Sequence, residues 1–176
     1  MPQSVLFDPP EIEFLDGHPY QKVSPKRTHA LVQAALLRVL GDCAVGRGEV
    51  GPEWRFALGA VDITYTEFVP DIAFVSYERI RPLNDDDAEE PPFAPDIAIE
   101  VRSPSNRAAY IAQKMLRYLK CGSVLVLDVD PAKRTIVAHA ASGVRTFTEA
   151  DRFEHEAAPW FSFEVGSIFP KPRGAR

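Results

Sequence analysis

Apolar side chains recur at helical spacing in the first third of the chain. From Thr28 to Leu40 they are separated by three or four residues, or adjacent, which gathers them on one helix face. They are Leu31, Val32, Ala35, Leu36, Val39 and Leu40. Thr28 suits a helix N-cap, and Gly41 suits the position that ends a helix. The pattern predicts an amphipathic helix over these residues.

Strand-like patterns follow this helix. Residues 54–58 and 61–65 carry apolar side chains at every second position, and residues 69–75 form a further run that is mostly apolar. Hairpins are expected near both ends of the chain. Asp16-Gly17 is a turn sequence between two short apolar runs, and residues 135–140 and 144–147 resemble the two strands of a second hairpin.

The stretch after Asp96 predicts a crossover between two strands. Residues 97–101 form a short apolar strand that carries one carboxylate, and a turn with Ser105 or Asn106 as helix cap follows. A helix then runs to about Lys120, and residues 124–129 form a largely buried strand. A buried strand, a helix and a second buried strand are typical of a mixed sheet in an α/β fold.

Length and charge narrow the class of protein. The chain has 176 residues, a length suited to one domain over 1–176 with its own core. Its net charge of −5 argues against a protein that coats nucleic acid through a basic surface. The excess of acid comes from residues 85–90, which read DDDAEE. This run lies in an acidic, Pro-rich segment, about 81–95, that we expect to be a loop because it has little apolar surface.

The remaining bulk features predict a soluble, cytoplasmic protein. The two cysteines, Cys43 and Cys121, form no Cys-x-x-Cys pair, which argues against a disulfide scaffold or a cysteine zinc site. The N-terminal residues lack the pattern of a secretory signal. The longest apolar stretch, residues 30–40, is too short to span a membrane.

Three ionisable residues stand in apolar surroundings. Asp71 opens the strand at 69–75, Glu100 lies inside the strand at 97–101, and Lys114 follows Glu100 by fourteen residues. On a helical wheel Lys114 falls beside the apolar face of its helix, next to Tyr118. Two carboxylates at the ends of neighbouring strands, with a cation from an adjoining helix, suit metal-assisted hydrolysis of a phosphodiester.

The chemistry explains the choice of residue types. Carboxylate oxygens bind Mg²⁺ or Mn²⁺, and the backbone carbonyl of Val101 can supply another ligand. The metal activates a water molecule, and Lys114 orients that water or stabilises the developing negative charge. Structural roles stay open for the same residues: a Pro-Asp turn, a strand Glu that faces solvent, and a lysine whose ammonium reaches the surface.

Several of these residues lie in motifs that resemble those of the Uma-two (Uma2) family, once a domain of unknown function. The most specific block is Glu100-Val-Arg-Ser-Pro-Ser105 with Lys114 fourteen residues after its glutamate. The resemblance covers most of the chain, from Leu15 to about Phe169. It also includes Asp16-Gly17, Ser24-Pro25, His29, Pro70 to Val75, Tyr118, Gly122 and Asp130-Pro131.

The resemblance implies a fold, an activity and a set of site residues. Uma-two proteins are described as endonucleases of the PD-(D/E)XK restriction-endonuclease-like superfamily. The expected fold is an α/β (α+β) core with a mixed sheet flanked by helices, an N-terminal hairpin and a C-terminal β extension. The family pattern makes Asp71 and Glu100 the acids that bind Mg²⁺ or Mn²⁺ and Lys114 the catalytic lysine. DNA is the expected substrate, and His29 and Arg102 are candidate substrate contacts.

The chain also departs from the family pattern. Arg102 stands where an aliphatic residue is usual, and it can contact phosphate or form a salt bridge that lowers metal affinity. Tyr110 stands where an aspartate is frequent, and Val126-Leu127 replace an aromatic pair, with Asp128 close behind in a strand expected to be apolar. These departures motivate an alternative function, a catalytically degenerate nuclease fold that binds nucleic acid or protein.

A few other residues have two alternative roles each. Glu53 and Glu67 flank the early strands, and each is either an additional acid of the site or a solvated strand end. The Phe-rich C-terminal segment packs into the core or forms the surface of a homodimer. Its aromatic residues are Phe153, Trp160, Phe161, Phe163 and Phe169.

Overall fold

The computed structural model describes residues 12–21, 26–61, 64–103 and 108–171. The helices are α1 (Arg27–Cys43), α2 (Tyr77–Ile80), α3 (Asp85–Glu89), α4 (Ala108–Lys120) and the 3₁₀ helix η1 (Val165–Ile168). The strands are β1 (Ile12–Leu15), β2 (His18–Gln21), β3 (Gly48–Pro52), β4 (Phe56–Val61), β5 (Thr64–Phe68), β6 (Ile72–Ser76), β7 (Ile97–Val101), β8 (Leu125–Asp130), β9 (Thr135–Ala140), β10 (Gly143–Thr148), β11 (Arg152–Phe153) and β12 (Phe163–Glu164).

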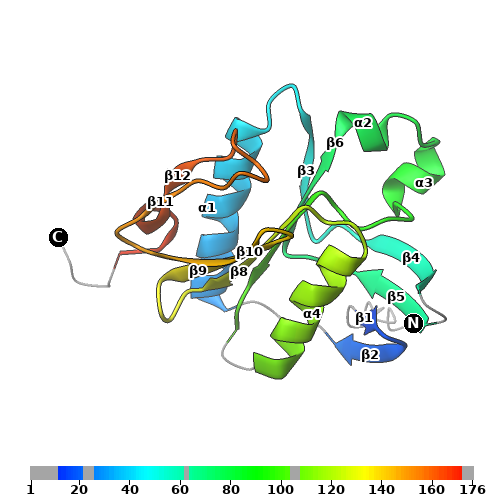
Figure 1. Cartoon of the computed structure of the whole chain (residues 1–176), viewed down its shortest axis with the longest axis horizontal. Coiled ribbons are helices and arrows are strands. Elements are labelled where there is room, and N and C mark those ends of the chain that lie inside the picture. The colour runs from blue at the N-terminus through cyan, green and yellow to red at the C-terminus, as the bar shows by residue number, and fades with distance from the viewer. Residues whose placement is uncertain (1–11, 22–25, 62–63, 104–107, 172–176) are drawn as a thin grey trace, which may run out of the picture.

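The centre of the molecule is a six-stranded mixed sheet with the strand order β10-β9-β8-β7-β6-β3 (Figure 1). The pair β7–β8 is parallel, and the other neighbouring pairs of this sheet are antiparallel. Helix α4 connects the two parallel strands, which confirms the predicted crossover. The expected helix caps, Ser105 and Asn106, lie outside the described residues.

One face of this sheet is covered by α1. Three side chains of the predicted apolar stripe, Val32, Leu36 and Leu40, are each 0% exposed. They pack in one core with the side chains of β7 that point to the same face, Ile97 and Ile99. The helix extends one residue before and three residues beyond the predicted stretch. Alternation along β7 then directs Glu100 to the opposite face.

The opposite face is covered by α4 and by a smaller four-stranded sheet with the order β2-β1-β5-β4. Ile111 and Met115 of α4 pack here, and the ring of Tyr118 stacks on Phe68 at a centroid distance of 4.1 Å. Both predicted hairpins are present, with Leu15 pairing with His18 in β1–β2 and β9 pairing with β10. The N-terminal hairpin therefore lies in the same layer as the lysine-bearing helix.

The C-terminal aromatic residues belong to the core. Phe153 and Phe161 are 0% exposed, and they pack with Phe163 and Phe169 in the core under α1. Of the two roles expected for this segment, packing into the core is the one observed. The homodimer expected from these side chains has no support, because they are buried within the chain.

The acidic segment 81–95 differs from the expected loop, because it contains the short helix α3. Asn84 caps this helix by accepting a hydrogen bond from the Asp87 backbone N–H at 2.8 Å. Acidic residues in a first turn are stabilised by the exposed N–H groups at a helix N-terminus. The segment is also tied to β4, since the Ala57 N–H donates to the Pro91 carbonyl at 3.1 Å. Apolar side chains of the segment, Leu83, Ala88, Phe93 and Ala94, also pack against the core under α4. The segment is therefore ordered by packing as well as by capping, which its acidic composition did not predict.

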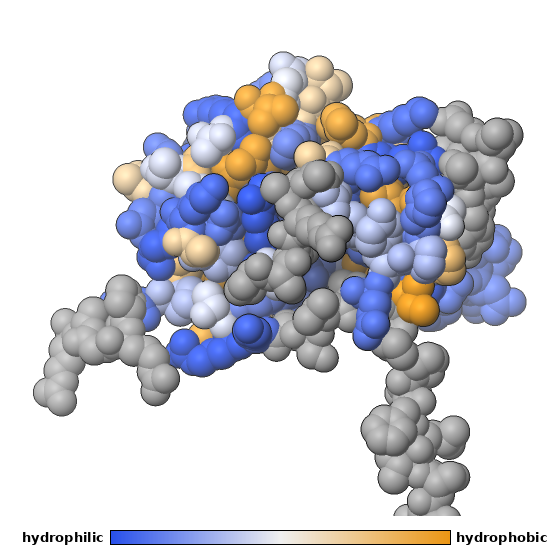
Figure 2. Space-filling model, turned by 90° about the horizontal axis from the view of Figure 1, so that it is seen from below, coloured by the Kyte–Doolittle hydropathy of each residue, from blue (hydrophilic) through white to orange (hydrophobic). Residues whose placement is uncertain are grey.

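The face of the molecule shown in Figure 2 is mostly hydrophilic, with hydrophobic side chains in separate small groups. Among the described residues, no helix is both long enough and apolar enough to cross a membrane.

Candidate active site

The two predicted acids lie at the ends of adjacent antiparallel strands. Ile72 of β6 pairs with Ile99 of β7, so Asp71 and Glu100 each stand one position beyond that pair. Both are buried, with 4% exposure for Asp71 and 6% for Glu100. The backbone N–H of Val101 donates to the Asp71 carboxylate at 2.6 Å. This bond links one acid directly to the strand that carries the other.

A second set of contacts holds Asp71 from the side of α1 and β3. The Nε2 atom of His29 lies 3.2 Å from Asp71 Oδ2, and the His29 side chain is 10% exposed. The side chain of Gln33 donates to the Asp71 carbonyl at 2.9 Å and to Glu53 Oε1 at 2.8 Å. His29 therefore contacts a predicted acid directly, and Glu53 belongs to the surroundings of that acid.

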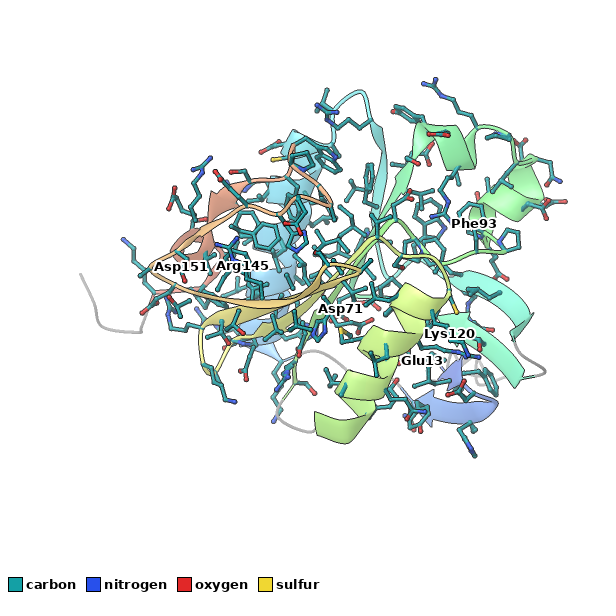
Figure 3. The ribbon with its side chains drawn as sticks, viewed as in Figure 1. Glu13, Asp71, Phe93, Lys120, Arg145 and Asp151 are labelled. Carbon is teal, nitrogen blue, oxygen red and sulfur yellow. The ribbon has the colours of Figure 1, made fainter. Side chains whose placement is uncertain are left out.

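Lys114 contacts two carboxylates. Its Nζ atom is 2.8 Å from Glu100 Oε1, and it donates to the two oxygens of Glu13 at 2.9 and 2.7 Å. Lys114 is 2% exposed and Glu13 is 4% exposed. Glu13 belongs to β1, so the N-terminal hairpin supplies an acid to this cluster (Figure 3). Lys114 is thus a buried ion-pair partner, and its ammonium does not reach the surface.

Two tyrosines of α4 complete the cluster. The Tyr118 hydroxyl donates to Glu100 Oε1 at 2.7 Å, and the Tyr110 hydroxyl donates to Glu13 Oε1. Burial raises the pKa of both hydroxyls above the ordinary value, so both remain protonated donors. Tyr110 replaces the acid that is frequent in the family, and here it contributes a neutral hydrogen bond in place of a charge.

Burial and charge act in opposite directions on Lys114. Burial by itself lowers the pKa of a lysine, whereas the carboxylates of Glu100 and Glu13 stabilise its charged form. The charges dominate and hold the pKa of Lys114 well above its usual value. The ammonium form is therefore the resident form near neutral pH.

Arg102 is held by acids at the end of β7 and β8. Its guanidinium makes two hydrogen bonds to Asp128, at 2.7 and 2.5 Å, and lies 3.7 Å from Asp130 Oδ2. Hydrogen bonding to the Asp128 carboxylate raises the pKa of Arg102. Of the two roles expected for Arg102, the salt bridge is the contact present, and it gives the buried Asp128 a charged partner.

Glu67, the other candidate acid, lies in β5 and pairs with Phe14 of β1. It is 6% exposed and forms an ion pair with Arg55, whose Nε atom also lies 3.8 Å from Glu90. Its role is therefore that of a buried ion-pair partner in β5, not that of a solvated strand end.

A divalent cation has a limited set of protein ligands here. Among the described residues, no group of three or more His, Cys, Asp or Glu side chains is arranged as a metal cage. Mg²⁺ usually keeps several waters and takes only one or two carboxylates from the protein. Asp71 and Glu100 match that smaller requirement. The pair fits a hydrated ion of this kind and does not fit a closed, all-protein site.

Glu13 and Gln33 are the site residues that sequence reasoning missed. Both neighbours of Glu13, Ile12 and Phe14, are apolar, so alternation alone did not mark which face of β1 is buried. In the structure Glu13 shares the buried face with Leu15, which is 2% exposed. Gln33 interrupts the apolar stretch of α1, and that interruption was the available signal for it.

Comparison with known proteins gives a family match. The model of the family named Uma2, described as "Putative restriction endonuclease", matches residues 3–165. No curated protein matches the chain.

A solved structure shows the same fold. It is described as "a putative nuclease belonging to DUF820 from Anabaena variabilis ATCC 29413" and superposes with a TM-score of 0.77 at 22% sequence identity. The superposition covers 91% of this chain and 90% of that chain. The fold class expected from the sequence, a mixed sheet flanked by helices in a nuclease-like arrangement, is confirmed.

Proposed function

The chain belongs to the Uma2 family of restriction-endonuclease-like proteins, and on this premise we propose that it is a metal-dependent endonuclease that hydrolyses phosphodiester bonds in DNA. Two contacts support the proposal: Asp71 accepts a hydrogen bond from the backbone N–H of Val101, the residue after Glu100, and the ammonium of Lys114 lies 2.8 Å from Glu100. Strand β7 thus links the two acids, and α4 brings a cation to one of them.

In this proposal Asp71, Glu100 and the backbone carbonyl of Val101 hold Mg²⁺ or Mn²⁺. When bound, such an ion lowers the pKa of a water molecule and neutralises charge on the phosphoryl oxygens. The Val101 N–H and His29 fix the orientation of the Asp71 carboxylate, and Tyr118 does the same for Glu100. A carboxylate fixed by neighbours presents its remaining lone pairs in one direction.

The two cations have different proposed roles. Lys114 stays protonated and stabilises negative charge that develops on the phosphate or on the attacking water. Arg102 lies two residues after Glu100, and its side chain is 31% exposed. It contacts a backbone phosphate only when it exchanges Asp128 for that phosphate, and His29 is the second candidate substrate contact.

The test uses Glu100→Gln, which removes the charge and keeps the size of the side chain. We expect Mn²⁺ binding measured by calorimetry to be lost, and nicking of plasmid DNA with Mn²⁺ to fall by about 100-fold or more. Glu49→Gln is the matched control, because Glu49 is an exposed glutamate of β3 in the same sheet. Cleavage by Glu100→Gln at the rate of the unmodified protein would remove Glu100 from the mechanism.

A second function, a degenerate nuclease fold that binds nucleic acid or protein, is favoured by the contacts of the two cations. Lys114 and Arg102 are both held by carboxylates. A metal ion would have to compete with these cations for the carboxylates, and a phosphate would have to compete with the carboxylates for the cations. This function predicts no Mn²⁺ binding, together with DNA binding whose affinity falls as salt is raised. The same calorimetric titration therefore separates the two functions.

A further inference from the structure

The ammonium of Lys114 sits among three carboxylate oxygens from two acids. Both oxygens of Glu13 and Oε1 of Glu100 lie within 2.9 Å of Nζ. A lysine ammonium has three N–H donors, so this arrangement offers one acceptor oxygen for each. Glu13 supplies two of the three, although 101 residues separate it from Lys114 in the sequence.

Two acids and one ammonium meet in this buried cluster. Glu13 accepts a hydrogen bond from the Tyr110 hydroxyl, and Glu100 accepts one from the Tyr118 hydroxyl. A buried charge is stabilised by the groups that contact it, so the partners that hold Lys114 affect how Glu100 is held.

Lys114 and a divalent ion compete for the same carboxylate. If Glu100 were the only acid near Lys114, the ammonium would be drawn fully onto it, and a metal ion would have to displace that contact. Glu13 opposes this by holding the ammonium with both of its oxygens. The acid on the hairpin therefore determines how strongly Lys114 competes with a metal ion.

We propose that Glu13 is a positioning residue that holds the Lys114 ammonium away from exclusive pairing with Glu100, and so keeps Glu100 able to bind a divalent cation. The proposal rests on the metal-dependent function proposed above. It gives the N-terminal hairpin a direct part in the site, through a residue that itself touches neither metal nor substrate.

The test compares two variants of the hairpin by Mn²⁺ calorimetry on the full chain. Glu13→Gln keeps the shape and loses the charge, so Lys114 is left with Glu100 as its carboxylate partner in the cluster. We expect the Mn²⁺ dissociation constant to rise about 10- to 100-fold, the range typical when a group that orients a metal ligand is changed.

Asp16→Asn is the matched control. Asp16 lies in the turn of the same hairpin, 3.0 Å from Arg117 and 3.0 Å from Gln113 of α4, and makes no described contact with Lys114. It reports on loosening of the hairpin alone, and its Mn²⁺ affinity should stay within about twofold of the unmodified protein. An equal loss of affinity in both variants, or no loss in Glu13→Gln, would overturn the proposal.

A Lys114→Met background adds a second check. With the competing ammonium removed, Glu13→Gln should no longer weaken Mn²⁺ binding, because the two effects act through one contact. A full effect of Glu13→Gln in that background would contradict the proposed route. If the unmodified protein binds no Mn²⁺, the proposed function falls as well. If it binds Mn²⁺ and Glu13→Gln binds equally well, this inference alone falls.

Discussion

Several buried acids in the described part of the chain are met by arginine side chains. Asp128, 3% exposed, is matched by two hydrogen bonds from Arg102. Glu67 is matched by Arg55 in the same way. Removing one member of such a pair leaves the other buried and unpaired, which costs more than the pair contributes. The buried acids are therefore more informative as partners than as single residues.

His139 gives a prediction about pH. It pairs with Val126 across β8–β9, and its Nε2 atom is buried without a hydrogen-bond partner in the described part of the chain. Burial lowers the pKa of His139 below 6.5, and Arg102 adds to this while the charge of Asp128 opposes it. As pH falls through about 6.5, the unfolded chain binds this proton before the folded protein does, so the free energy of unfolding decreases.

Replacing His139 with glutamine should remove that part of the pH dependence. Urea unfolding of both proteins at pH 7.5 and pH 5.5 measures it, and the unmodified protein should lose more stability between the two values. Equal losses would mean that the protonation of His139 does not differ between the folded and unfolded states.

The individual residues of the candidate site could be predicted only in part. Asp71, Glu100 and Lys114 were found because each is an ionisable residue in an apolar pattern, a signal that burial creates. Glu13 carries the same burial, but Glu11 and Glu13 alternate with Ile12 and Phe14, a pattern typical of a strand whose acids face solvent. Its partner is 101 residues away, and a contact of that range depends on the fold.

Elements were predictable where their pattern is long or continuous. Strand β7 and helix α4 were located correctly because one is buried on both faces and the other is amphipathic. Strands β4 and β5 lie two or three residues later than the predicted stretches, and their register shifts between Ala57 and Gly59. Such an irregularity displaces the alternation that locates a strand.

Strand β3 was not predicted at all. Its residues, Gly-Glu-Val-Gly-Pro, have little strand propensity, so pairing with β6 decides its conformation. Gly48 pairs with Ser76 at the start of this edge strand. A Cβ atom at position 48 would meet the Val75 carbonyl oxygen at 2.1 Å and the Phe74 ring at 2.6 Å. The glycine is required by this close approach of two backbones.

Gly48→Ala should therefore weaken the edge of the sheet. The added methyl group forces the two strands apart, and we expect a loss of about 1–3 kcal/mol in the free energy of unfolding. Gly41→Ala is the control, since it lies in α1 with no heavy atom within 4 Å of the added group. Helix propensity should make that variant more stable by about 0.5–1 kcal/mol. Denaturant unfolding of the unmodified protein and the two variants measures both changes. If Gly48→Ala leaves the free energy of unfolding unchanged, the pairing of β3 with β6 contributes little to stability.

The whole molecule is organised by one sheet with a core on each face. The core under α1 includes the C-terminal aromatic residues, and the core under α4 includes Tyr118, which contacts Glu100. Neighbouring residues of β7 belong to different cores, as Ile99 and Ala98 show. Because the same strands supply both cores, loss of one should expose the other. The chain is thus expected to unfold as one unit, in keeping with the single domain predicted from its length.

Phe153→Ala tests whether the two cores unfold together. Phe153 is 0% exposed and packs against Phe147, Phe161 and Phe163, so its truncation should lower the free energy of unfolding by about 3–5 kcal/mol. The two tryptophans report on the two cores separately, because Trp160 packs against the core under α1 and Trp54 against the core under α4. Phe153→Ala is combined with Trp54→Phe, which leaves Trp160 as the fluorescent probe, or with Trp160→Phe, which leaves Trp54. Each double variant is compared with the matching single Trp→Phe variant, and both should show the same decrease in the unfolding midpoint. A midpoint that falls for Trp160 and stays unchanged for Trp54 would divide the molecule into two folding units, with Tyr118 in the one that Phe153 does not stabilise.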